Sequence, residues 1–239
     1  MATHAISIKG LVKEFSGVRA LDDITLSVKK GELFGLIGPN GSGKTTMIRC
    51  LTGQTLPDEG SLSVQGIDVL KKPVKVREVT GIIPEQENPP SFLTAEEYLV
   101  FVGRVRNLTR IHKKIDAWFR YLNCDDQRDV LCKDLSRGTR QKLMFAQAFL
   151  HEPDIAFIDE PLINLDPVTQ KRVKDFLRQQ VKEKKTIFFS THVLEIAEEI
   201  CTRIGIIDKG NLIHEGSVQA LKRKKEKLEK FFITKVENA

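Results

Sequence analysis

The sequence of 239 residues predicts an α/β fold built around a single phosphate-binding loop. The segment GPNGSGKTT, residues 38–46, stands between an apolar run at 33–37 and apolar residues with helical spacing at 47–51. A second apolar run, at 155–158, ends in an acidic pair. A long helical pattern lies between these two strands in the chain, so we expect a helical subdomain, about 85–152, inserted into an α/β core.

The loop at 38–46 satisfies the pattern G-x-x-x-x-G-K-[ST] of the P-loop. Its glycines let the backbone turn sharply and bring N–H groups against phosphate oxygens, and the following helix N-terminus adds partial positive charge. We expect Lys44 to bridge the β- and γ-phosphates and the Thr45 hydroxyl to ligate Mg²⁺. A glycine-rich turn without a ligand would leave the strand, helix, lysine and threonine unexplained. The loop residues expected to bind the nucleotide phosphates are Gly38, Pro39, Asn40, Gly41, Ser42, Gly43, Lys44, Thr45 and Thr46.

The chain before the loop has the alternation of half-buried strands, at 6–8 and 21–28, with a turn signal at Ser16-Gly17. This pattern predicts an antiparallel β subdomain at the N-terminus. Phe15 lies near the turn. An exposed aromatic there would stack on a purine ring, a contact worth ~1–3 kcal/mol by analogy with base stacking; a core aromatic is the alternative.

The predicted helical subdomain begins with a polar, proline-rich loop at 85–91. Thr94 and Glu97 have the spacing of a capping box, which opens a helix. The apolar stripe that continues over 111–122 includes Trp118, which we interpret as a core residue. The helical pattern runs to about residue 150.

Acidic and histidine side chains follow two later apolar runs. Asp159 and Glu160 end the run at 155–158, and His192 follows the next run. Parallel strands place their ligand sites at their C-terminal ends, so these side chains are expected on the edge that carries the P-loop. We expect Asp159 to hold Mg²⁺ with Thr45, Glu160 to polarise a water with a gain of roughly 10²–10⁴ in rate, and His192 to contact the γ-phosphate. An acidic turn and a structural histidine are the alternatives.

Composition sets the outer limits. Apolar content of 41% and charged content of 29% are those of an ordinary soluble protein, and no apolar run approaches the ~18 residues of a membrane helix. The N-terminus lacks the pattern of a secretory signal. Four scattered cysteines without a C-x-x-C pair indicate reduced thiols in a cytosolic protein. A net charge of +6 permits contact with an anionic membrane or nucleic acid and requires neither.

The basic tail, about 218–239, is expected to be helical with a solvated face; membrane contact is the alternative.

The ordered series of motifs resembles the ATP-binding subunit of an ABC transporter nearly end to end. GPNGSGKTT looks like Walker A, and IAFIDEP looks like Walker B with Glu160 as its catalytic glutamate. LSRGT, residues 135–139, looks like the ABC signature. LINLD, which ends at Asp166, looks like the D-loop. STH, which ends at His192, looks like the H-switch. Phe15 matches the A-loop aromatic that stacks on adenine, which favours that role for it. Other P-loop NTPases lack a signature between the Walker motifs, and the family fold has the same core, antiparallel subdomain and helical insert.

The chain departs from the usual family pattern at three motifs. The signature is usually LSGGQ, and here Arg137 and Thr139 replace its first paired glycine and its glutamine. At the Q-loop, Glu85 stands where glutamine is usual and Gln86 follows it, so either could serve. The D-loop has Ile163-Asn164 in place of Ser-Gly. The signature residues expected to contact the ATP of a partner subunit are Ser136, Arg137, Gly138 and Thr139.

The resemblance implies a single ABC ATP-binding domain over 1–239 that binds ATP and Mg²⁺ and hydrolyses ATP. It implies a head-to-tail homodimer or a pair with another ABC subunit, and a membrane permease made as a separate polypeptide. The expected location is cytoplasmic, peripheral on the inner face of the cell membrane, with no nucleic-acid partner. Pro84-Glu85, the SRGTRQK run and the segment 228–232 resemble prokaryotic exporter ATPases.

Other function classes stay open at this point. A soluble ABC ATPase could power a non-transport assembly or repair machine. A regulatory nucleotide-binding module would have negligible turnover, which the presence of Glu160 and His192 disfavours. A P-loop kinase would leave the signature and the D-loop unexplained.

Overall fold

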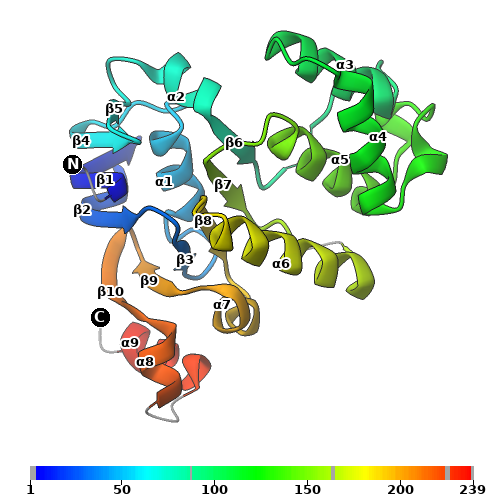
Figure 1. Ribbon diagram of the computed structural model, residues 1–239. Helices are drawn as coiled ribbons and strands as arrows, with labels where there is room; N and C mark the ends of the chain where they lie inside the picture. The colour runs from blue at the N-terminus through cyan, green and yellow to red at the C-terminus, as the bar shows by residue number, and fades with distance from the viewer. Residues whose placement is uncertain (1–3, 87, 163–164, 224–226, 238–239) are drawn as a thin grey trace.

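The computed structural model describes residues 4–86, 88–162, 165–223 and 227–237, which form two β-sheets and the helices around them (Figure 1). The antiparallel sheet contains β1 (His4–Phe15), β2 (Val18–Lys29), β4 (Glu59–Val64) and β5 (Ile67–Asp68). The second sheet contains β3 (Leu33–Ile37), β6 (Thr80–Ile83), β7 (Ile155–Asp159), β8 (Thr186–Thr191), β9 (Arg203–Asp208) and β10 (Asn211–Ser217). The α-helices are α1 (Lys44–Leu51), α2 (Pro73–Val79), α3 (Ala95–Val105), α4 (Ile111–Leu122), α5 (Arg137–Phe149), α6 (Pro167–Lys182), α7 (Leu194–Ile200), α8 (Val218–Arg223) and α9 (Leu228–Glu237).

The six-stranded sheet has the order β10-β9-β3-β8-β7-β6. Its strands pair in parallel from β9 to β6, and β10 joins the edge antiparallel to β9. Every residue of β3, β7 and β8 is buried. Continuous apolar strands of this kind are what a parallel sheet covered on both faces requires.

Two hydrophobic cores cover the two faces of this sheet. Phe34 and Leu36 of β3 point into the core shared with α1 and the antiparallel sheet. Leu33 and Ile37 of the same strand point into the core shared with the helices α3 to α7. Side chains alternate between the faces of a strand, so one short apolar segment binds both layers to the sheet.

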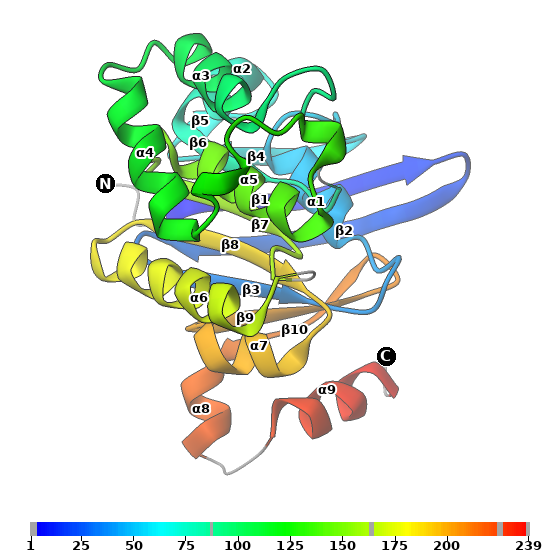
Figure 2. The same ribbon diagram turned by 90° about the vertical axis from the view of Figure 1, so that its right-hand side faces the viewer.

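The helices α3, α4 and α5 gather at one end of the molecule, far from α8 and α9 (Figures 1 and 2). The predicted capping box is confirmed, because Thr94 Oγ1 accepts from Glu97 N at 3.2 Å and Thr94 N donates to the Glu97 carboxylate at 2.9 Å. Trp118 is half-buried in an aromatic cluster, with ring centroids 5.8 Å from Phe145 and 5.3 Å from Phe176. These rings join α4 to α5 and α6.

Two local features differ from the sequence predictions. The apolar run from Val79 to Ile83 predicts a strand, but in the structure Val79 ends helix α2 and the strand β6 begins at Thr80. Helix α2 has seven residues with Pro73 as its first, and it buries only Val76, so it has no helical period to detect. The basic tail is helical with an exposed basic face, as predicted, in the two helices α8 and α9; the exception is Leu228 of α9, which is fully buried in the core that includes residues of α7.

All four cysteines are free thiols, as predicted, and the structure shows in addition that they are buried. Burial raises the pKa of the Cys50 and Cys124 thiols to about 11, which keeps them protonated. Among the described residues, no helix combines the length and the apolar character needed to cross a bilayer.

Candidate nucleotide-binding site

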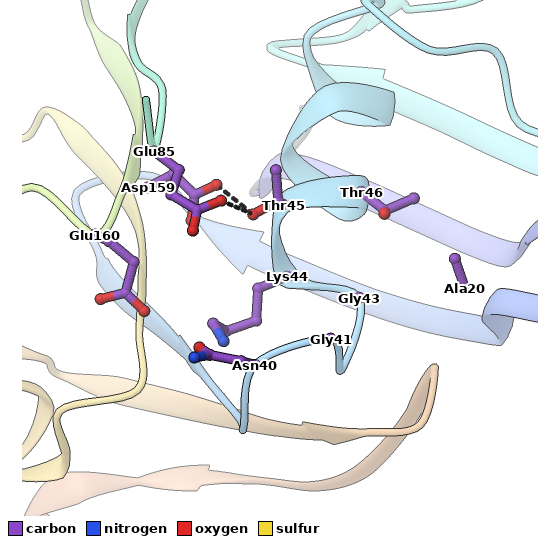
Figure 3. A pocket seen from close by; sticks show the side chains of 10 residues that line it. All are labelled: Ala20, Asn40, Gly41, Gly43, Lys44, Thr45, Thr46, Glu85, Asp159 and Glu160. Carbon is purple, nitrogen blue, oxygen red and sulfur yellow. Dashed lines mark hydrogen bonds between the residues drawn. The ribbon is translucent and has the colours of Figure 1, made fainter. Parts of the chain in front are cut away.

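Four parallel strands end at one edge of the six-stranded sheet and bring the predicted motifs together. Strand β3 leads into the P-loop, β6 is followed by Pro84 and Glu85, β7 ends at Asp159, and β8 precedes His192. The parallel pairing of these strands therefore converts four distant segments of the sequence into one site. The pocket at this edge (Figure 3) is lined by Ala20, Asn40, Gly41, Gly43, Lys44, Thr45, Thr46, Glu85, Asp159 and Glu160.

The backbone path of the P-loop requires glycine at two positions, Gly38 and Gly43. A Cβ on Gly38 would lie 2.2 Å from the carbonyl oxygen of Ile207. Gly43 has φ +109°, and a Cβ there would lie 2.4 Å from the carbonyl oxygen of Ala20. Only glycine fits such close approaches and such a φ, so the loop stays narrow and its N–H groups can face a phosphate.

Lys44 lies at the start of α1 with only 6% of its surface exposed. Its Nζ donates to the carbonyl oxygens of Gly38 at 2.8 Å and Pro39 at 3.0 Å, so it folds back over the loop. Burial lowers the pKa of Lys44, and the nearby carboxylates, Glu160 first, oppose that shift. The ammonium group is thus held inside the loop by oxygen atoms that a phosphate could replace.

The Thr45 hydroxyl lies between two carboxylates. Thr45 Oγ1 donates to Asp159 Oδ2 at 2.6 Å and is 3.4 Å from Glu85 Oε2 (Figure 3). Asp159 is 1% exposed, and its Oδ1 accepts from the Ser190 hydroxyl. Gln86 lines a neighbouring pocket and not the P-loop pocket. Of the two candidate Q-loop residues, the structure brings Glu85 to Thr45.

The hydroxyl and carboxylate oxygens at this point suit Mg²⁺, which favours oxygen ligands and usually takes one or two carboxylates together with substrate phosphates. Within the described ranges, no group of three or more His, Cys, Asp or Glu residues is arranged to hold a metal ion. A cation here would accordingly depend on Thr45, two carboxylates and the nucleotide itself.

Glu160 is held by the end of the neighbouring strand. Its Oε2 accepts from Thr191 Oγ1 at 3.0 Å, and its Oε1 accepts from His192 N at 2.8 Å and lies 2.7 Å from His192 Nδ1. Glu160 has φ +49°, the left-handed conformation, and 8% exposure. Sequence reasoning missed Ser190 and Thr191 as supports for the acidic pair. Their place beside His192 at a strand end was the available signal.

The remaining predicted site residues lie outside the P-loop pocket. Ser136 caps helix α5, where its Oγ accepts from Thr139 N at 3.1 Å. Arg137 is exposed as the first residue of α5, and Gly138 follows it half-buried. Phe15 is 49% exposed at the end of β1. None of these five residues, Ser136, Arg137, Gly138, Thr139 and Phe15, lines the pocket.

Asp166, the predicted D-loop residue, caps helix α6. Its Oδ1 accepts from Val168 N at 3.1 Å and Thr169 N at 2.9 Å, and its Oδ2 accepts from Thr169 Oγ1 at 2.6 Å. These bonds from Thr169 lower the pKa of Asp166. The other predicted D-loop positions, Ile163 and Asn164, lie outside the described residues.

A P-loop, a Walker B carboxylate pair and a histidine on one parallel-sheet edge define a P-loop ATPase. The model of the family described as ABC transporter matches residues 21–163. The ABC transporter ATP-binding protein NatA of Bacillus subtilis is 33% identical over 92% of this chain and 91% of its own length. The daunorubicin/doxorubicin resistance ATP-binding protein DrrA of Streptomyces peucetius is 36% identical over 92% of this chain and 67% of its own. This chain belongs to the ABC transporter family, as an ATP-binding subunit and an ABC ATPase.

Solved structures agree with the predicted fold class. An ATP-binding subunit of an ABC transporter superposes with TM-score 0.90 and 27% identity, over 97% of this chain and 99% of that one. CbiO1 from Clostridium perfringens, part of the ABC transporter complex cbiONQ, superposes with TM-score 0.78 and 25% identity, over 94% and 93% of the two chains. The ABC ATPase fold, an α/β core with an antiparallel β subdomain, is thereby confirmed.

Proposed function

We propose that this ABC ATPase dimerises head-to-tail on ATP and drives export through a membrane permease made as a separate chain. The observation that carries this proposal is the convergence of the P-loop, the Thr45–Asp159 pair and the Glu160–His192 pair at one edge of the parallel sheet. Export is supported by relatives, among them DrrA and a Nod factor export ATP-binding protein I from Ralstonia nicotianae, 33% identical over 92% of this chain and 69% of its own length.

The P-loop N–H groups and Lys44 bind the phosphates. Lys44 exchanges its contacts to loop carbonyls for the β- and γ-phosphate oxygens. Thr45 and Asp159 would hold Mg²⁺, which when bound would neutralise charge on the phosphates. Phe15, exposed at the edge of the antiparallel sheet, stacks on adenine.

Glu160 is the group that accepts a proton from the attacking water. The three donors from Thr191 and His192 orient its carboxylate at the pocket wall. A general base so placed contributes roughly 10²–10⁴ in rate. His192 lies half-exposed beside Glu160 and contacts the γ-phosphate. Its ring thereby links the position of the γ-phosphate to that of the Glu160 carboxylate.

The signature serves the nucleotide of the partner subunit. Ser136 and Arg137 are exposed at the N-terminus of α5 and do not line the chain's own P-loop pocket. The N-terminus of a 13-residue helix favours anions, so it suits a γ-phosphate brought by a second subunit. Two such sites close a head-to-tail dimer, in which Asp166 lies near the junction as the D-loop residue.

The chain acts as one ATP-binding domain over 1–239, with the helical segment 85–152 as the insertion that passes dimer closure to the permease. Its place is the cytoplasmic face of the cell membrane. This assignment predicts recovery of a multi-span protein, in stoichiometric amount, when tagged protein is purified from detergent-solubilised native membranes. A soluble complex, with the ATPase absent from the membrane fraction, would favour a non-transport ABC machine.

The dimer is tested with the variant Glu160→Gln. Without the base, ATP binds and is not cleaved, so the variant is expected to run as a dimer in light scattering at saturating ATP and as a monomer without ATP. The matched control is the double variant Glu160→Gln with Lys44→Ala, which loses phosphate binding and stays monomeric. A monomeric Glu160→Gln at saturating ATP counts against the head-to-tail dimer.

A further inference from the structure

The backbone at Glu160 has a conformation that residues with a side chain rarely adopt. Glu160 has φ +49°, in the left-handed region, where residues other than glycine are uncommon. It also precedes Pro161, and a residue before proline favours extended backbone. Such a conformation persists only where the surrounding structure holds it. The turn that carries the proposed base is therefore fixed by contacts from its neighbours.

Two hydrogen bonds hold the backbone of this turn from opposite sides. Glu160 N donates to the carbonyl oxygen of Ser190 in β8 at 3.2 Å. Gln141 Nε2 of α5 donates to the carbonyl oxygen of Pro161 at 3.0 Å, in a buried bond. Gln141 is 2% exposed, so no water replaces the amide if it is removed. The two bonds together leave the backbone at residue 160 little freedom to relax.

The backbone conformation decides where the Glu160 carboxylate lies. The carboxylate accepts from the Thr191 hydroxyl and from the backbone N–H of His192, both at the end of β8. A change of Glu160 from the left-handed to the extended conformation would turn its side chain away from these donors. The Gln141–Pro161 bond thus acts on the carboxylate indirectly, through the residue that follows it in the chain.

Gln141 belongs to the helix that begins at the signature segment. Ser136 caps α5, and Gln141 lies in its second turn. A further contact joins the next residue of α5 to the start of α6, with Lys142 Nζ 4.0 Å from Asp166 Oδ2. The start of α5 and the segment after Glu160 are therefore connected within one chain, although 19 or more positions separate Gln141 from that segment in the sequence.

We propose that Gln141 is a positioning residue for the Glu160 base, which it holds in the left-handed turn through the carbonyl oxygen of Pro161. This inference rests on the proposed function, in which Glu160 accepts a proton from water. The bond also ties the base to the helix whose first turn receives the partner's nucleotide. The contacts of Lys44 and Thr45 to phosphate and cation do not depend on it.

The test separates turnover from binding in the variant Gln141→Met, whose side chain has a similar length and no donor. Steady-state ATPase assays give kcat and KM, and titration with a non-hydrolysable ATP analogue gives the dissociation constant. We expect kcat to fall by about tenfold or more, a part of the roughly 10²–10⁴ that a general base contributes, with KM and the dissociation constant within about twofold of wild type. Gln141→Asn keeps the amide but is one methylene shorter, and the same split is expected.

Gln147→Met is the matched control. Gln147 lies on the same helix, and its Nε2 likewise donates to a backbone carbonyl oxygen, that of Ile82 at 2.7 Å. This bond supports β6 and not the turn at Glu160, so kcat of Gln147→Met should match wild type. An equal loss of kcat in this control would overturn the proposal, because any weakening of α5 would then have the same effect.

A second readout is the dimer that Glu160→Gln is expected to form at saturating ATP. Adding Gln141→Met should leave this dimer intact in light scattering, since the cap of α5 by Ser136 remains. Loss of the dimer, a weaker dissociation constant in step with kcat, or a kcat within twofold of wild type would each overturn the proposed role of Gln141. Wild-type protein that binds the analogue and has no ATPase activity would overturn the proposed function, and this inference with it.

Discussion

Ser190 offers a direct test of how the strand ends build the proposed metal site. Its hydroxyl donates to Oδ1 of Asp159, whose Oδ2 accepts from Thr45 at 2.6 Å. Ser190 is fully buried and Asp159 is 1% exposed, so water has no access to replace a lost donor. Ser190→Ala removes one of the two hydroxyl groups that hold this carboxylate.

The expected magnitude follows from that geometry. A hydrogen bond to a charged group contributes about 1.5–3 kcal/mol, and the buried acceptor loses it without compensation. The free energy of unfolding of Ser190→Ala should fall by about that amount. Loss of a group that orients a metal ligand typically costs about 10–100-fold in metal affinity, so binding of the Mg²⁺–nucleotide complex should weaken in that range.

Two measurements check the reasoning about Ser190. Urea denaturation gives the free energy of unfolding, and titration with a non-hydrolysable ATP analogue in Mg²⁺ gives the affinity. Ser61→Ala, on an exposed position of β4, is the control for losing a serine hydroxyl from a strand. If Ser190→Ala matched wild type in both quantities, the Ser190–Asp159 bond would have no role in positioning the ligand.

Two further predictions concern the packing of α5 on β6. Desolvation, reinforced by Arg106, lowers the pKa of His151 to about 4, below its unfolded value near 6.5, so the unfolded chain binds more protons between these values. Stability should therefore fall as the pH drops from about 6.5 to 4, and His151→Gln should show a shallower fall in urea denaturation; equal slopes would contradict this. Gly81→Ala should lower the free energy of unfolding by about 1–3 kcal/mol, because the added Cβ would lie 2.5 Å from the backbone oxygen of Ala148. An unchanged melting temperature would show that α5 and β6 have room to separate.

Local patterns were sufficient for the features that depend on neighbouring residues. The P-loop needs its glycines, Lys44 and Thr45 within nine residues between a strand and a helix, so the motif contains its own structural context. The capping box of α3 likewise depends on residues three apart. Helix α2 was missed because its seven residues bury a single side chain and leave no period.

Choices between adjacent residues required the tertiary structure. Glu85 and Gln86 are equally polar neighbours, and only the way the chain leaves β6 brings Glu85 to Thr45. The basic sequence around Leu228 predicts a solvated helix face, whereas the structure packs α9 beside α7 and buries Leu228. Sequence periodicity shows which residues are apolar, but it does not show which element of the fold each apolar side chain packs against.

The sequence by itself determined the class of this protein, the parallel-sheet core and the chemistry available at its strand ends, because these follow from short-range patterns. The tertiary structure alone decided how that chemistry is assembled. Ser190 reaches Asp159 across 31 positions of the chain, and Thr191 reaches Glu160 across the same separation. The pairing of β7 with β8 sets these contacts, and a register between strands so far apart in sequence is fixed only when the whole sheet forms.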